Sequence, residues 1–129
     1  MYRKKKILIV DDEVINHYVS ERMLEMLGWK GTLECATNGK EALSLLLDNC
    51  RKLIAWPDLI LLDLHMPVMN GIEFLEELGR SACFDRNTAS TIAIVSSTVN
   101  PAEIQRVHDL GIQHFIEKPI TLEKLQRLN

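Results

Sequence analysis

The sequence predicts an α/β domain in which a five-stranded parallel sheet carries helices on both faces. Two observations lead to this prediction. Short aliphatic runs alternate along the chain with segments whose apolar residues recur at helical spacing, in the order βαβαβαβαβα. The runs are also continuously apolar, which is typical of parallel strands that are covered by helices on both sides.

The predicted strands are short, and each is bounded by polar residues. Three of them are continuous aliphatic runs, at 7–10, 59–62 and 92–95. A weaker run spans 112–116. Residues 32–36 alternate more loosely, with Leu33 and Cys35 on the same side, so this strand could lie nearer an edge of the sheet.

The first two helices are predicted from spacing and from their ends. Between the first two strands, four apolar residues recur at helical spacing: Ile15, Val19, Met23 and Met26. Gly28 is a fitting C-terminal stop for this helix. Asn38 and Glu41 form a plausible capping box at the start of the second helix.

Clearer start signals mark the remaining helices. A third helix follows Asn70 and Gly71. The fourth has the most complete set of signals, with a cap, a first-turn proline, a capping-box partner and a stop: Asn100, Pro101, Glu103 and Gly111. A fifth helix begins near Thr121, and it is short because the chain stops ten residues after Pro119. This last helix is either short by nature or truncated.

Length and composition set limits on the function. A chain of 129 residues and 14.8 kDa fits one domain, which we place at residues 1–129. The net charge of -3 and the lack of a basic run beyond residues 3–6 argue against nucleic-acid binding by this domain. No apolar run approaches the length of a membrane span. We therefore expect a soluble, cytoplasmic protein that does not bind a membrane.

The cysteines and histidines give weaker signals. The three cysteines, at 35, 50 and 83, are odd in number and contain no CxxC pair, so we expect small buried thiols in a reducing compartment. No metal-binding spacing links His17, His108 and His114, and we expect them on the surface or in strands.

Polar side chains follow four of the predicted strands, at the point where each strand ends. Asp11 and Asp12 follow the first strand, and Asp63 follows the third. Ser96 follows the fourth strand and Lys118 follows the fifth. Functional residues of open parallel sheets gather beyond these carboxyl ends, so we expect the five side chains to converge.

Such a cluster favours metal-assisted phosphoryl chemistry. Two like charges 4 Å apart near a protein surface repel by roughly 4 kcal/mol, so three carboxylates would raise their pKa values or bind a cation. Hard oxygen ligands favour Mg²⁺ over zinc. Lys118 and Ser96 would add a point charge and a hydroxyl donor for a phosphoryl group. Asp63, alone at its strand end, is the best nucleophile.

Four stretches, each at a predicted strand end, resemble the receiver domain of two-component response regulators. They are "ILIVDDE", "PDLILLDLHMPVMNG", "IVSST" and "FIEKP". Each is common alone, but all four in order make a specific signal, and the resemblance extends from about Lys5 to the chain end. It implies a doubly wound, flavodoxin-like (βα)5 fold with strand order 2-1-3-4-5.

The resemblance also implies a role for each site residue. Asp63 would accept a phosphoryl group from a phosphohistidine on a partner histidine kinase or phosphotransfer protein. Asp11 and Asp12 would hold Mg²⁺ together with Asp63 and the main-chain carbonyl of His65, with Asp12 the direct ligand of the acidic pair. Ser96 and Lys118 would contact the phosphoryl group. The bond before Pro119 is a candidate cis peptide.

Two further implications concern the output of the switch. The matching positions Ser96 and Phe115 carry the coupling between hydroxyl and aromatic ring in this family. The face formed by the fourth helix, the fifth strand and the fifth helix, from about Asn100 onward, would then change and could serve partner docking or a homodimer. The His65 side chain would lie at the edge of the phosphoryl pocket. It would either have no effect on the chemistry or alter the lifetime of the phosphoryl group.

Three other functions compete with a phosphorylated signalling module that does not turn over a substrate. A flavodoxin-like cofactor binder should carry a Ser/Thr/Gly-rich loop where this chain has "DDEVIN". A phosphohydrolase of the haloacid dehalogenase type needs an aspartate where this chain has His65. A degenerate receiver would act only as a docking surface, and the complete set of site residues argues against it.

Overall fold

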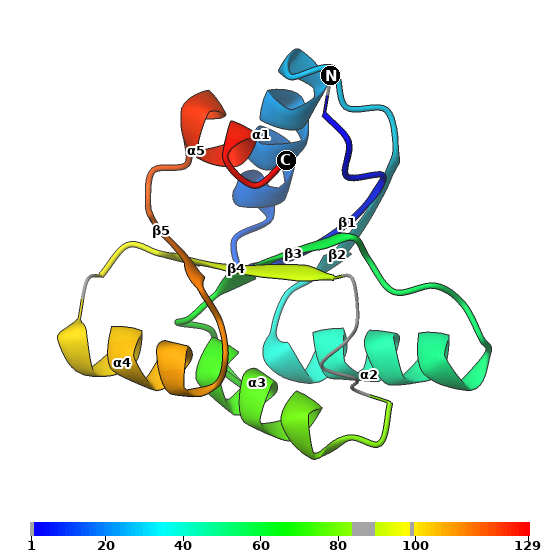
Figure 1. Ribbon diagram of the computed structural model, residues 1–129, viewed down its shortest axis with the longest axis vertical. Coiled ribbons are helices and arrows are strands. Elements are labelled where there is room, and N and C mark those ends of the chain that lie inside the picture. The colour runs from blue at the N-terminus through cyan, green and yellow to red at the C-terminus, as the bar shows by residue number, and fades with distance from the viewer. Residues whose placement is uncertain (1, 84–89, 99) are drawn as a thin grey trace.

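The computed structural model describes residues 2–83, 90–98 and 100–129. Five strands form one parallel sheet in the order β2-β1-β3-β4-β5, which confirms the predicted doubly wound fold (Figure 1). The strands are β1 (Lys6–Val10), β2 (Thr32–Ala36), β3 (Leu59–Asp63), β4 (Thr91–Ser96) and β5 (His114–Glu117).

Five helices alternate with these strands. They are α1 (Val14–Met26), α2 (Gly39–Arg51), α3 (Gly71–Arg80), α4 (Pro101–Asp109) and α5 (Leu122–Gln126). In Figure 1, α1 and α5 lie on one side of the sheet, and α2, α3 and α4 lie on the other. The described helices include none that is long and apolar enough to cross a bilayer.

The sheet is buried on both faces because alternate side chains of each strand point into different cores. Ile7 and Ile9 of β1 pack with Leu24 of α1 and Leu125 of α5. Leu8 and Val10, which alternate with Ile7 and Ile9 along β1, enter the second core, which α2, α3 and α4 cover. This double burial explains why the strands read as continuous aliphatic runs.

The helix starts follow the predicted caps with two corrections. Asn70 and Glu73 form a reciprocal capping box on α3. On α2 the Asn38 side chain accepts from the Glu41 amide, but the Glu41 carboxylate accepts from the Thr37 hydroxyl, so only half of the predicted capping box forms. On α4 the Asn100 side chain accepts from Ala102 instead. Glu103, predicted as the box partner, pairs with His65, which lies within reach across the site.

The α1 helix was predicted correctly, but the apolar residues that signalled it do not form its buried side. Its buried residues are His17, Ser20 and Leu24. Ile15, at 62% exposure, faces away from the sheet, as do Val19 and Met26. Met23, the fourth residue of the pattern, is half-buried and packs against the core. The apolar spacing therefore marks a stripe that is mostly exposed.

Strand β5 begins later than the predicted 112–116 run. Its first paired residue is His114, opposite Ala93, and it continues to Glu117. Ile112 is buried before the strand starts, in the same core as Val107. The aliphatic run thus includes a residue of the connection from α4.

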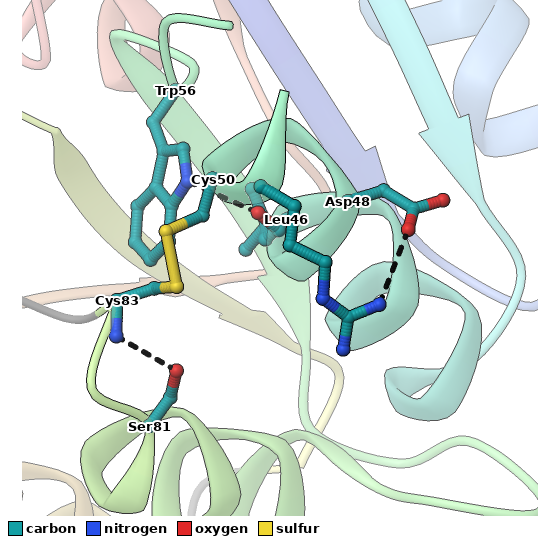
Figure 2. The surroundings of a disulfide bond; sticks show 7 residues. Leu46, Asp48, Cys50, Trp56, Ser81 and Cys83 are labelled. Carbon is teal, nitrogen blue, oxygen red and sulfur yellow. Dashed lines mark hydrogen bonds and ion pairs between the residues drawn. A yellow bond between two sulfur atoms is a disulfide. The ribbon is translucent and has the colours of Figure 1, made fainter. Parts of the chain in front are cut away.

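The expectation of three buried thiols is wrong. Cys50, in the last turn of α2, forms a disulfide with Cys83, just beyond α3 (Figure 2). Cys35 is a free thiol and is exposed. The pairing joins residues 33 apart because α2 and α3 lie against each other, a proximity that cysteine spacing does not reveal.

Candidate functional site

The strand ends bring four of the predicted side chains to one edge of the sheet. Val10 of β1 is in register with Leu62 of β3, so Asp11 and Asp63 are the next positions of adjacent strands. Ser96 is the last residue of β4, beside β3. Lys118 directly follows β5, and its amide donates to the Ser96 carbonyl at 2.8 Å.

Lys118 bridges two of the carboxylates. Its Nζ lies 3.2 Å from Oδ2 of Asp63 and 3.2 Å from Oδ2 of Asp11. Both carboxylates are nearly enclosed, and the Lys118 side chain is only 22% exposed. A long side chain from the residue after β5 therefore reaches over β4 to neutralise charge at the ends of β1 and β3.

Asp63 is held in an environment that disfavours its charge. Burial raises the pKa of this carboxyl, and the Asp11 carboxylate adds to the rise. The His65 amide, which donates to Oδ1 at 3.2 Å, and the Lys118 ammonium act in the opposite direction but do not cancel the effect of burial. A carboxylate in this position gains from any added cation.

Lys118 remains a cation despite its partial burial. Burial lowers the pKa of the Lys118 ammonium, but attraction to Asp63 and Asp11 outweighs it, so the net pKa is raised. The side chain therefore carries its charge at neutral pH and can contact an oxygen-rich group at this edge.

Asp11, Asp12 and Asp63 together fit a small divalent cation. One carboxylate oxygen from each lies within 4.8 Å of the others. Asp11 is already engaged, since its Oδ1 accepts from the Glu13 amide and its Oδ2 from the Asn16 side chain. Asp12 is exposed at the cluster. Hard oxygen donors in this arrangement suit Mg²⁺, which binds through a few carboxylates and retains water.

Ser96 lies fully buried at the same edge. Its Oγ donates to the Thr98 carbonyl at 3.1 Å and accepts from the Thr98 amide. Phe115 is half-buried and packs against the core that α2, α3 and α4 cover. The Lys118–Pro119 peptide bond is cis.

His17 corrects the expectation of a surface or strand position. It is buried on α1, and its Nε2 donates to the main-chain carbonyl of Asp11 at 2.8 Å. This contact fixes the chain at the start of the acidic pair. Sequence reasoning missed it because a histidine six residues away carries no metal or catalytic spacing. His108 and His114 are exposed, as expected for surface positions.

The structure also adds a partner for His65. Nε2 of His65 lies 3.3 Å from Oε1 of Glu103 on α4. The residue that follows the candidate nucleophile by two positions is therefore connected to a helix that begins after β4. Only the fold brings these two residues together, since they are far apart in the sequence.

Comparison with known proteins gives a family match over nearly the whole chain. The model of the response regulator receiver domain matches residues 7–128. Two-component response regulator 24 of Arabidopsis thaliana is 34% identical over 122 residues, which is 95% of this chain and 79% of the relative. Hybrid signal transduction histidine kinase K of Dictyostelium discoideum is 34% identical over 94% of this chain, which spans only 10% of that protein.

Solved structures agree with this match. The crystal structure of the CheX-CheY-BeF3-Mg+2 complex from Borrelia burgdorferi contains a chain that is 25% identical to this one, with a TM-score of 0.77. The match covers 96% of this chain and 85% of the other. The sheet order and the acidic cluster described above are thus found in a chain similar to known receiver domains.

Proposed function

The chain belongs to the response regulator receiver domain family, and from this premise we propose that Asp63 is its phosphoryl acceptor. It is a receiver domain of two-component systems, in which phosphorylation-dependent signalling is the function. The contacts of Lys118 Nζ with both Asp63 and Asp11, at 3.2 Å each, are the observation that most supports this choice of acceptor.

The proposed reaction is a transfer from a phosphohistidine. A carboxylate oxygen of Asp63 attacks phosphorus, the phosphorus–nitrogen bond breaks, and the imidazole leaves with its electron pair and takes up a proton. Asp63 then carries an acyl phosphate. The transferred group is rich in oxygen and negatively charged. The Lys118 ammonium can therefore exchange its contacts with the carboxylates for a contact with a phosphoryl oxygen.

We place a Mg²⁺ site at Asp12, Asp11 and Asp63, with the His65 carbonyl as a further ligand. The mutual proximity of the three carboxylates supports this placement. When bound, the ion would offset the negative charge of the carboxylates and of the incoming phosphoryl group. Ser96 would complete the contacts to that group.

The proposed partner is a histidine kinase or a histidine phosphotransfer protein. Such a donor must bring its imidazole to Asp63 and therefore contact the surface around this edge of the sheet. Val14, Ile15 and Tyr18 offer an exposed apolar surface on the first turns of α1, next to Asp11 and Asp12. We propose that the donor packs on this surface, and that the α4–β5–α5 face serves output or a homodimer.

This function implies a signalling domain that catalyses its own phosphorylation and slow dephosphorylation without turning over a substrate. We further propose that residues 1–129 act as one such domain and that it works in the cytoplasm, where phosphohistidine donors have access to it.

Intact-mass measurement tests the acceptor directly. After incubation with acetyl phosphate and Mg²⁺, the wild-type chain should gain one phosphoryl group and Asp63→Asn should gain none. Asp48→Asn is the matched control, because Asp48 is an exposed carboxylate on α2 and should leave phosphorylation unchanged. Full phosphorylation of Asp63→Asn would show that another residue is the acceptor. A wild-type chain that takes no phosphate would favour a degenerate receiver that only docks to partners.

A further inference from the structure

The bonded cysteines Cys50 and Cys83 lie at the end of the domain opposite to Asp63. In a parallel sheet covered by crossover helices, each helix starts near the carboxyl ends of the strands and finishes near their amino ends. Cys50 is in the last turn of α2, and Cys83 follows the end of α3. Their disulfide therefore lies at the amino edge, whereas Asp63 ends β3 at the carboxyl edge.

The backbone places these two cysteines for bonding without a change of fold. Their Cα atoms are 6.1 Å apart, inside the usual range for disulfides. Neighbouring turns also hold both segments in position: the Cys83 amide donates to Ser81 Oγ at 3.1 Å. The Trp56 indole donates to the Leu46 carbonyl, one turn before Cys50, at 3.1 Å (Figure 2).

Solvent can reach this pair. Cys50 and Cys83 are both half-buried residues, in contrast to Ile94 and Phe74, which are fully buried in the core. Small thiols and small disulfides can therefore approach it, as reversible exchange requires. Cys35 provides an internal comparison, because it is exposed on the edge strand β2 and is unpaired.

We propose that Cys50 and Cys83 form a reversible thiol–disulfide site that responds to low-molecular-weight disulfides. The thiolate of one cysteine attacks a sulfur of the small disulfide, whose S–S bond breaks and releases one small thiolate. The thiolate of the second cysteine then attacks the protein sulfur of the mixed disulfide and displaces the other small thiolate. Two protein thiols are oxidised, one small disulfide is reduced to two thiols, and these take up the two protons.

Reversibility rests on the proposed cytoplasmic location, where glutathione keeps most thiols reduced. Disulfides that do form there are usually transient and redox-sensing rather than permanent. In such a chain the disulfide of an accessible cysteine pair therefore forms and breaks as the ratio of oxidised to reduced glutathione changes. A glutathione titration of the purified protein does not depend on the cellular location or on the identity of the phosphoryl acceptor.

Oxidation at this site adds a second connection between α2 and α3. At the carboxyl edge the start of α2 is already bonded to the loop just before α3, because the Gly39 amide donates to the Met69 carbonyl at 2.9 Å. At the amino edge the disulfide joins their other ends. The oxidised form thus holds α2 against α3 at both ends, while Asp63 and Lys118 stay outside the bonded region.

The test is a titration in glutathione buffers of varied oxidised-to-reduced ratio, followed by acid quenching, alkylation in denaturant and intact-mass measurement. The chain has three cysteines. Fully reduced wild type should take three alkyl groups, and oxidised wild type should take one, on Cys35, with a smooth transition between them. Cys35→Ser should change from two groups to none over the same ratios.

Three outcomes would overturn the proposal. The wild type could keep three free thiols in the most oxidising buffer, it could stop at a glutathione adduct on Cys50 or Cys83, or it could keep the disulfide in the most reducing buffer. Cys50→Ser should lose the transition that wild type shows. Both redox forms of the wild type should accept phosphate from acetyl phosphate. A chain that never accepts phosphate would contradict the proposed function and leave the thiol result standing.

Discussion

The Lys118 ammonium makes equal 3.2 Å contacts with Oδ2 of Asp63 and with Oδ2 of Asp11. It therefore occupies, in the unphosphorylated chain, the space between the candidate nucleophile and one of the candidate metal ligands. The attraction raises the pKa of Lys118, while burial keeps the pKa of Asp63 above its usual value. A metal ion and this ammonium must then compete for the same two carboxylates.

Replacing Lys118 with methionine should separate its effect on Mg²⁺ binding from its effect on the rate of phosphorylation. Without the competing ammonium, Mg²⁺ should bind more tightly, by up to about fivefold if the lost pairing is worth about 1 kcal/mol. Phosphorylation by acetyl phosphate should nevertheless become slower, because no cation meets the transferred oxygens. Calorimetric Mg²⁺ titration and intact mass against time measure both effects. Weaker Mg²⁺ binding in Lys118→Met than in wild type would contradict the competition, and Lys52→Met, an exposed lysine just after α2, is the control.

The two neighbouring aspartates should contribute unequally to metal binding. Asp11 already accepts hydrogen bonds on both oxygens, whereas Asp12 is exposed at the cluster. Asp12→Ala should therefore weaken Mg²⁺ binding by about tenfold or more, and by a larger factor than Asp11→Ala does. The same calorimetric titration ranks the two variants. Phosphorylation should stop in excess EDTA, and phosphorylation that continues at full rate would exclude a metal requirement.

His65 should affect how long the phosphoryl group lasts but not how fast it is accepted. Its ring is held by Glu103, at 3.3 Å, and we expect it to lie beside the approach of water to Asp63. His65→Ala should open that approach to water and shorten the phosphoryl lifetime by about threefold or more, which is at least ~0.7 kcal/mol in the barrier. Phosphate release measures the decay. Glu103→Gln should cause a smaller change, and equal decay rates in all three proteins would leave His65 without a role.

The sequence predicted an element and its buried side correctly wherever its apolar residues are the ones that are buried. The aliphatic runs of β1, β3 and β4 are buried on both faces, so their composition identified them. The pattern failed on α1, since the residues that touch the core include His17 and Ser20 while Ile15 faces solvent. On that helix most of the apolar stripe is exposed, and its first turns belong to the surface on which we propose that the phosphoryl donor packs.

The candidate site was predictable because each of its residues ends a strand. Asp11, Asp63, Ser96 and Lys118 needed only the rule that the carboxyl ends of parallel strands share an edge. The His65–Glu103 pair and the Cys50–Cys83 disulfide could not be found in this way. Both depend on how one helix lies against its surroundings, which residue spacing alone does not determine.

Tyr2 should make the stability of the domain sensitive to alkaline pH. Its hydroxyl donates to the Leu125 carbonyl at 2.8 Å, and burial raises its pKa from 10.0 to about 12. Between these values the unfolded chain releases the proton and the native chain keeps it, so the free energy of unfolding falls as pH rises from 10 to 12. Tyr2→Phe should lose less stability over this range, although it begins about 1 kcal/mol lower at neutral pH.

Denaturant unfolding at several pH values measures the Tyr2 effect. Tyr18→Phe is the matched control, since Tyr18 is 60% exposed on α1 and should leave the slope with pH as in wild type. Identical slopes for wild type and Tyr2→Phe would show that Tyr2 does not set the alkaline loss.

The last prediction concerns the connection between the phosphoryl site and the α4–β5–α5 face. The Ser96 hydroxyl is bonded to the Thr98 carbonyl at 3.1 Å, and Phe115 of β5 is in register with Ile94, two residues before Ser96. When Asp63 is phosphorylated, Ser96 should exchange Thr98 for a phosphoryl oxygen. The space that it leaves allows the half-buried Phe115 ring to turn further inward.

The energy available for this switch is sufficient to shift populations. Full burial of a phenylalanine contributes about 1.5–3 kcal/mol relative to exposure, and Phe115 loses no hydroxyl partner because it has none. A shift from 1:99 to 99:1 needs about 5.5 kcal/mol, so the ring supplies part of it and the phosphoryl contacts must supply the rest. NMR shifts of the free protein and its beryllofluoride complex report the change. Ser96→Ala should reduce the shifts at Phe115 and α4, whereas Ser97→Ala, an exposed neighbour, should not. Shifts as large in Ser96→Ala as in wild type would mean that the signal reaches α4 by another route, for which the His65–Glu103 contact is the next to be tested.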